Sequence, residues 1–231
     1  MARPPLTTAA LVAMSRSLLV EGGPDAVVVR EVARRLGVTA PALYRHVSGR
    51  DDLLTLLIAA CTDEVTTVCA AALAACAPDD VEGRLRAATW AFRSWALAHP
   101  PEFGLVYGTP VARYAAAEDG PTVTATRRFG GLFGSVFVDL LRAGRLRTVA
   151  DGDLETVVCA DLQAAAVAMG LPMRPGELYP FVVGWHRMLG VVSVEVSGHL
   201  RWAFGEDATA FVRGQLDDLA DDLLLPVAEV C

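Results

Sequence analysis

The stretch from residue 29 to residue 47, VREVARRLGVTAPALYRHV, constrains the fold more than any other part of the chain. Ala33 is a small residue at the point where a second helix must cross the first closely. Gly37, four positions later, tolerates the positive φ that a tight turn requires. Leu43 follows six positions further on and provides an apolar anchor that faces back into a small core. The spacing therefore predicts two crossed helices joined by a turn.

Apolar residues recur at helical spacing along the rest of the chain, as in Leu11, Met14 and Leu18. Residues 191–196, VVSVEV, have strand propensity. No second strand is predicted that would satisfy their backbone groups, so we expect a helix there too. The pattern predicts an all-α chain. After a first helix that ends near Gly22, we expect helices over residues 29–36, 40–47, 50–75, 81–99, 122–143, 154–170, 176–204 and 206–226, with a short helix and a loop in 101–121.

Charge separates an N-terminal domain, residues 1–50, from a C-terminal domain, residues 51–231. The first contains seven arginines and three acids, a net of +4. The second contains 13 arginines and 24 acids, a net of −11. A basic end on an acidic body approaches phosphate with one face only. We expect the long helix that starts at Arg50 to couple the two domains rigidly.

Composition excludes several classes of protein. Hydrophobic residues make up 53% of the 231 residues, enough for a core and too many for a disordered chain. No run reaches the roughly 18 uncharged apolar residues of a membrane span, and no signal peptide is recognised, so we expect a cytoplasmic protein without a membrane partner. No P-loop, nucleophile elbow or paired catalytic carboxylates occur, which predicts a non-enzyme without a cofactor.

The cysteines and histidines do not form a site either. The five cysteines contain no CxxC pair, and the four histidines are scattered, so neither a disulfide scaffold nor a metal site is expected. Cys69 and Cys76 lie seven positions apart on one helical face. Two interpretations stay open for them: a redox-sensing pair or buried small thiols.

The second helix of the residue 29–47 stretch has residue types that suit contact with DNA. Ala40 and Ala42 are small enough to let its first turn approach base edges in the major groove. Thr39 is placed to cap that helix. Phosphate donors surround it, and these are Arg30, Thr39, Tyr44, Arg45, His46 and Arg50.

Residues 6–57 resemble the DNA-binding domain of the TetR/AcrR family of transcriptional regulators. The resemblance is carried by the strings ARRLGVT (33–39), ALYRHV (42–47) and RDDLL (50–54). It implies an N-terminal three-helix helix-turn-helix domain that binds an operator. It also implies operator contacts by Thr39, Tyr44, His46 and Arg50, although family members usually have lysine at the last position. A dimer on a palindrome would have half-sites roughly 34–36 Å apart.

Residues 90–110 resemble the C-terminal domain called WHG in a subset of these regulators. The match is carried by Trp95, His99-Pro100, Phe103 and Gly108-Thr109-Pro110, and further on by Gly190, Glu195 and Gly198-His199. Residues 111–120 depart from the usual pattern. The resemblance implies that the C-terminal helical domain binds a small-molecule inducer and that its last two helices form the homodimer.

Aromatic residues at helical spacing are suited to line an apolar cavity for that ligand, although core packing explains any single one of them. The aromatic candidates are Phe92, Trp95, Phe103, Tyr107, Phe129, Phe133 and Trp185, and the polar candidates for orienting a ligand include Arg93, His99 and Gln163. An apolar or amphipathic ligand is expected.

The sequence therefore predicts a DNA-binding regulator, most simply a repressor released from a palindromic operator by a small molecule. The operator, the effector and the sign of regulation stay open. Two alternatives remain. One is a TetR-like helical protein that binds a small molecule or a protein partner without regulating DNA, and the other is an enzyme of a kind that no motif marks.

Overall fold

A computed structural model describes residues 6–117 and 119–226 of the chain. Its contacts divide the chain into two compact units. The first contains residues 1–65 and 99–126, and the second contains residues 66–98 and 127–231. The domain boundary that the sequence predicts at residue 50 stays a prediction. Within the described residues the secondary structure is helical, which confirms the all-α fold.

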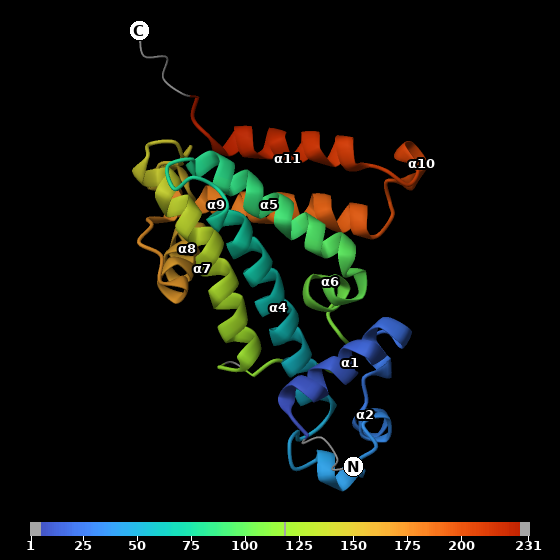
Figure 1. The fold of residues 1–231 in the computed structure, drawn as a ribbon. Helices are drawn as coiled ribbons and strands as arrows, with labels where there is room; N and C mark the ends of the chain where they lie inside the picture. Colours follow the sequence, from blue (N-terminus) through green and yellow to red (C-terminus); the bar gives the residue numbers. More distant parts are fainter. Residues whose placement is uncertain (1–5, 118, 227–231) are drawn as a thin grey trace. The chain divides into compact units, whose positions relative to one another are not determined.

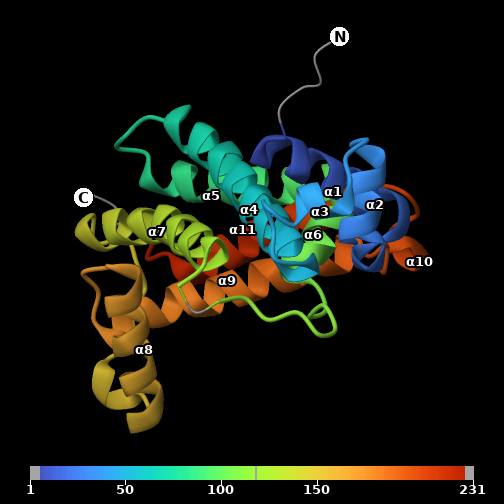
Figure 2. The same ribbon diagram turned by 90° about the horizontal axis from the view of Figure 1, so that it is seen from below.

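The first unit is built on short helices at the N-terminus. They are α1 (Thr8–Gly22), η1 (Pro24–Ala26), α2 (Val29–Arg35) and α3 (Ala40–Leu43), followed by the start of α4 (Arg50–Ala74) and by α6 (Pro100–Tyr107). The Thr7 hydroxyl caps α1 by accepting the N–H of Ala10 at 3.2 Å. Figure 1 shows α6 beside α1, and Figure 2 shows α3 beside α2. The core of this unit contains Leu11, Leu18, Leu19, Val27, Val32, Leu43, Leu53, Leu54 and Leu57.

The second unit contains the longer helices. They are the end of α4, α5 (Val81–Ala98), most of α7 (Pro121–Arg142), α8 (Thr156–Met169), α9 (Pro175–Val196), α10 (Arg201–Phe204) and α11 (Thr209–Leu223), with the turn η2 (Asp151–Asp153). In Figure 1, α11 runs alongside α9 and α5, and Figure 2 shows α8 against α9. A single antiparallel bridge joins Leu146 to Leu224.

Three predicted helices end three or more residues earlier than expected, and the one predicted over 206–226 is α11, which begins at Thr209 and ends at Leu223. The helix predicted over residues 40–47 ends at Leu43, and the Ser48 N–H is hydrogen-bonded to the Asp52 carboxylate at 2.6 Å, at the turn into α4. The helix predicted over 176–204 ends at Val196, because Gly198 takes a positive φ of 71°. The N–H groups after Val196 bond back to the carbonyls of Glu195 and Val194, which is a Schellman end. Residues 191–196 are helical, as expected.

α4 is the one helix of the described residues that is long and apolar enough to cross a membrane. Length and composition alone do not identify a span, since the core helix of a water-soluble protein passes the same test. In this helix 44% of the apolar window is buried by other parts of the protein. Asp63 and Glu64 also lie near the middle of the helix, where carboxylates are costly in lipid. The two carboxylates therefore disfavour a position in the hydrocarbon core of a bilayer.

Candidate functional site

The turn between α2 and α3 has the geometry of a helix-turn-helix. Gly37 follows α2 with φ 63°, and the N–H of Val38 bonds to the Ala33 carbonyl at 2.9 Å. Together with the bond from the Gly37 N–H to Arg34 at 3.1 Å, this ends α2 in a Schellman motif. Thr39 then caps α3 by accepting the Ala42 N–H at 3.3 Å. Ala33 and Leu43 are buried, as the sequence predicts for residues at the crossing of two helices.

The side chains around α3 face solvent. Tyr44 is 52% exposed, and Arg45 and His46 are exposed beside it in the turn that follows α3. Thr39 is exposed, and Ala40 and Ala42 are half-buried. Arg30 is exposed in the first turn of α2. This surface therefore presents small side chains flanked by hydrogen-bond donors.

Two of the arginines near this surface are held by acids. Arg34 bonds to Glu31 at 2.6 and 2.8 Å, and Arg35 bonds to Glu31 at 2.9 Å and to Glu21 at 2.6 Å. Hydrogen bonds from Arg35 and Ser17 lower the pKa of Glu21 to about 2. Those from Arg34 and Arg35 lower the pKa of Glu31 to about 2. Both acids stay ionised at neutral pH and neutralise these arginines.

Arg16 and Arg50 are also engaged within the first unit. Arg16 bonds to Glu64 of α4 at 2.6 Å, and its Nε lies 3.2 Å from the buried carboxylate of Glu102 in α6. One nitrogen of Arg50 bonds to the Pro24 carbonyl at 3.0 Å and to Asp25 at 3.1 Å.

The arginines that remain are those best placed for an external anion. Among the described residues 6–50, Arg30 and Arg45 are the two arginines without an acidic partner. Arg45 lies in the exposed turn that follows α3, and Arg30 lies in the first turn of α2. These two side chains therefore provide positive charge that no acid in the described residues 6–50 neutralises.

Aromatic rings predicted as ligand contacts meet in the second unit. The Phe92 ring lies 5.9 Å from that of Phe129 and 5.5 Å from that of Trp185. Phe133 lies 5.1 Å from Phe129 and 6.3 Å from Trp185, centroid to centroid. α5, α7 and α9 contribute these four rings. They form one cluster of tilted and edge-to-face pairs.

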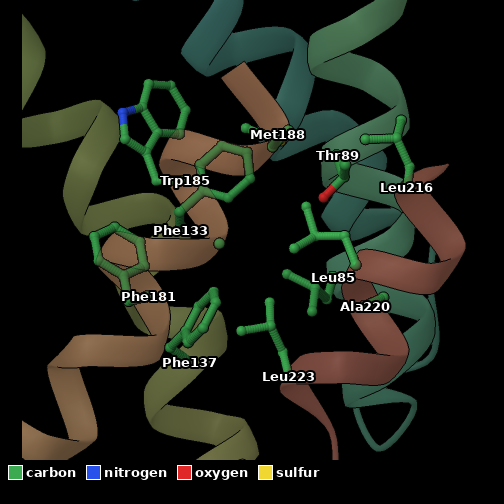
Figure 3. Close-up of a pocket in the computed structure, with 12 residues that line it drawn as sticks. Leu85, Thr89, Phe133, Phe137, Phe181, Trp185, Met188, Leu216, Ala220 and Leu223 are labelled. Atoms are coloured by element: carbon green, nitrogen blue, oxygen red, sulfur yellow. The ribbon is translucent and has the colours of Figure 1, made fainter. Parts of the chain in front are cut away.

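A small apolar pocket opens beside this cluster (Figure 3). The space at its centre has a volume of about 30 Å³, which is room for one or two water molecules. Phe133 and Trp185 are the two predicted ligand residues that line it. The other lining residues are Leu85, Thr89, Phe137, Phe181, Gly184, Met188, Leu216, Leu219, Ala220 and Leu223.

Most of the residues that line this pocket are not among the ligand residues predicted from the sequence. The spacing of Phe129, Phe133 and Phe137 on α7, and of Phe181, Trp185 and Met188 on α9, is the signal that marks it. Each set repeats every three or four residues and so lies on one face of its helix.

The remaining predicted ligand residues do not join the pocket. His99, Phe103 and Tyr107 belong to the first unit, where His99 Nε2 lies 3.5 Å from Glu64 and the rings of Phe103 and Tyr107 are 5.4 Å apart. Gln163 is exposed on α8, and Trp95 is buried on α5. These positions result from long-range packing, which the spacing of residues does not encode.

Arg93 does not line the pocket and instead forms a buried ion pair with Glu195. Only 4% of the residue is exposed, and its guanidinium makes two hydrogen bonds to Glu195, one of them at 2.7 Å from Nε. It also bonds to the Thr209 hydroxyl at 3.1 Å and lies over the Trp90 ring at 4.4 Å. Arg93 therefore joins α5 to α9 and to the start of α11.

The thiol of Cys69 is buried and bonds to the Ala88 carbonyl at 3.6 Å. Burial raises its pKa to about 12. Cys76 lies just after α4 and is half-buried, and its thiol bonds to the Ala72 carbonyl in the last turn of that helix. Because the thiolate is the reactive form, this geometry favours the interpretation of Cys69 as a packing residue.

Family models match both parts of the chain. Residues 11–57 match the model described as bacterial regulatory proteins of the tetR family. Residues 85–219, more than half of the chain, match the model described as a tetracyclin repressor-like C-terminal domain. The narrower resemblance to the WHG subset stays a prediction.

Named relatives and solved structures agree with these models. The HTH-type transcriptional regulator Rv1816 of Mycobacterium tuberculosis is 29% identical over 197 residues, which is 82% of this chain and 80% of the relative. The regulatory protein SCO4313 has a crystal structure with a TM-score of 0.71 and 26% identity, over 92% of this chain and 94% of that one.

A more distant structure shares the fold alone. TetR from Acinetobacter baumannii AYE, a variant in complex with minocycline, has a TM-score of 0.56 and 19% identity, over 94% of this chain and 96% of that one. The matched models and the named relatives are regulators. The chain therefore belongs to the TetR family of bacterial transcriptional regulators.

Proposed function

We propose that this regulator is a homodimeric repressor that leaves a palindromic operator when a small apolar or amphipathic molecule binds to its C-terminal helices. In this proposal residues 1–50 bind DNA, and residues 51–231 bind the effector and dimerise. The protein acts in the cytoplasm and by binding, without catalysis.

The observation that carries the DNA-binding part is the surface around α3. The small Ala40 and Ala42 at its start favour close approach to base edges. Exposed Tyr44 and His46 follow the helix, and Arg30 and Arg45 have no acid beside them among the described residues. Such donors are suited to phosphate contacts that fix the register of the protein on the duplex. The Arg50 side chain, which bonds to η1, adds a phosphate contact only if it leaves Asp25.

The effector part is supported by the aromatic cluster of the second unit and by the pocket beside it. A TetR protein of the same fold is known in complex with minocycline, which supports a ligand in this kind of helical domain. Release from DNA then requires that the ligand prefers the conformation that does not fit the operator.

The dimer is supported by an apolar face on α9 and α11. Val194 and Phe211 are each 40% exposed, and an open groove of about 390 Å³ runs between them, with Val191 and Leu200 in its lining. Exposed apolar surface of this kind marks an interaction site. A two-fold dimer on this face would pair each copy with the same face of the other.

Selection of bound fragments from a random DNA pool at low salt tests the DNA-binding part. We expect enrichment of a palindrome by the intact protein, because the dimer binds two half-sites. Tyr44→Ala should lose retention of the selected palindrome. Binding is measured at low and at physiological salt, since phosphate contacts weaken as salt rises.

Tyr179→Ala is the matched control, because Tyr179 is a similarly exposed tyrosine on α9 of the second unit. It should retain the palindrome as the unchanged protein does. A pool without any enriched sequence at low salt would contradict the proposal, as would equal losses in the two tyrosine variants.

A further inference from the structure

The pocket of the second unit contains no charged side chain. Its twelve lining residues come from α5, α7, α9 and α11, and ten of them are hydrocarbon, thioether or glycine. Thr89 and the indole of Trp185 provide the only polar side-chain groups. In Figure 3 the Thr89 oxygen points toward the space between the lining side chains, whereas the Trp185 nitrogen points away from that space.

Charged groups lie beside the pocket but have other contacts. Arg86, Arg213 and Asp217 line an adjacent opening that shares Thr89, Leu216 and Ala220 with the pocket. Arg86 bonds to Asp217 and Asp221, and the Arg213 guanidinium lies over the Trp90 ring at 4.3 Å. Arg93 is held by Glu195 and Thr209. His186, which follows Trp185, is exposed, and its Nδ1 lies 2.8 Å from the Val182 carbonyl of its own helix. The Thr89 hydroxyl, in contrast, makes no hydrogen bond within residues 6–117 and 119–226. It is the one group that remains for a polar atom of a ligand.

We propose that the effector is an uncharged, largely apolar molecule that contains a ring and makes at most one hydrogen bond, to Thr89. This inference rests on the proposed function and narrows its ligand class. A carboxylate or an ammonium would lose its water here and find no counter-charge among the twelve lining residues, which is costly. A ring fits because Phe133, Phe137, Phe181 and Trp185 offer faces and edges for tilted stacking.

The pocket must widen for such a molecule, because its space of about 30 Å³ is smaller than one aromatic ring. Met188 and Leu223 line it and have flexible ends, and methionine adapts to irregular gaps. Binding therefore selects a conformation in which these ends have moved. A ligand that binds only the widened form shifts the population toward that form, as an effector must.

Gly184 of α9 and Leu223 of α11 face each other in the lining of the pocket. A Cβ at Gly184 would lie 2.8 Å from Cδ1 of Leu223, so alanine would add a methyl group to the pocket wall and force the leucine end to shift. Gly131 of α7 does not line the pocket, and a Cβ there would meet no atom within 4 Å. The two glycines form a matched pair for filling the pocket or leaving it unchanged.

The test uses toluene, benzoate and phenol as probes of the full chain, with the melting temperature and calorimetric affinity as readouts. Toluene should raise the melting temperature, because a ligand of the folded state stabilises it. Benzoate has the same ring with a charge and should have no effect. Gly184→Ala should weaken toluene binding by about tenfold or more, and Gly131→Ala should leave it unchanged.

A second variant keeps the test decisive if Gly184→Ala fails to fold. Thr89→Val conserves shape and removes the hydroxyl, so it should weaken phenol binding by about tenfold and leave toluene binding unchanged. Benzoate binding as tight as toluene binding would overturn the inference, and so would the absence of any toluene effect. Failure of operator selection would contradict only the proposed regulation, since toluene binding is measured without DNA.

Discussion

At the scale of single residues, the arginines of the N-terminal part differ in what their charges do. Arg34 and Arg35 neutralise Glu31 and Glu21, and both acids have pKa values of about 2 for that reason. Arg30 and Arg45 have no such partner among the described residues. The net charge of residues 1–50 therefore overstates how many arginines are available to phosphate.

Arg30→Ala should reduce the salt dependence of operator binding. Each arginine that neutralises a phosphate releases counterions, so the slope of log affinity against log salt should become shallower by about two for a dimer that loses one contact per protomer. The measurement is a titration of the selected operator at several salt concentrations.

Arg142→Ala is the matched control for that titration. Arg142 is an exposed arginine of α7 in the second unit, so its removal changes the net charge by the same amount. For Arg142→Ala, the slope of log affinity against log salt should equal that of the unchanged protein. Equal slopes in all three proteins would contradict a phosphate contact by Arg30.

At the scale of elements, one buried ion pair fastens three helices of the second unit. Arg93 of α5 is bonded to Glu195 near the end of α9 and to Thr209 at the start of α11. Both charged side chains are nearly inaccessible to solvent. Glu195 lies three residues before Gly198, whose positive φ follows the end of α9. The pair therefore holds the end of α9 and the start of α11 against α5.

Glu195→Gln should destabilise the protein by about 3–5 kcal/mol, because it leaves the Arg93 guanidinium buried without a counter-charge. Urea unfolding followed by circular dichroism measures this loss. Glu206→Gln is the control, since its ion pair with Arg201 at 3.5 Å is exposed and should contribute less than about 1 kcal/mol. Similar losses in the two variants would show that the buried pair contributes no more than an exposed one.

At the scale of the whole molecule, charge is divided along the sequence, with a net of +4 in residues 1–50 and −11 in residues 51–231. We therefore expect only the N-terminal part to attract DNA. A single helix-turn-helix with few free arginines binds weakly, so a second copy on the other half-site is needed for useful affinity. The exposed apolar face on α9 and α11 is the surface that we propose for this pairing.

Val194→Glu should convert the dimer to a monomer, because the carboxylate would be buried without a partner at the two-fold interface. Sedimentation equilibrium measures the mass of the variant in solution. Its operator affinity should also be lower than that of the unchanged protein. Val167→Glu is the control, since Val167 is an exposed valine on α8, outside this face. A variant at Val194 that sediments as a dimer would contradict the proposed interface.

The local features of the chain were predictable from sequence because their causes lie within a few residues. Ala33, Gly37 and Leu43 formed the expected turn, and Thr39 capped α3 as predicted. The helical period also predicted most of the later helices. The end of α9 was missed, although Ser197-Gly198 carries a recognisable helix stop.

The sequence by itself determined the helix-turn-helix, since hydrogen bonds between near neighbours decide caps and turns. Only the tertiary structure decided which charges and rings meet. Arg93 pairs with a glutamate 102 positions away, and Arg50 with an aspartate 25 positions away. Phe137 and Phe181 come together from different helices. Such contacts depend on how whole helices pack, and no periodicity within a single helix specifies the partner on another.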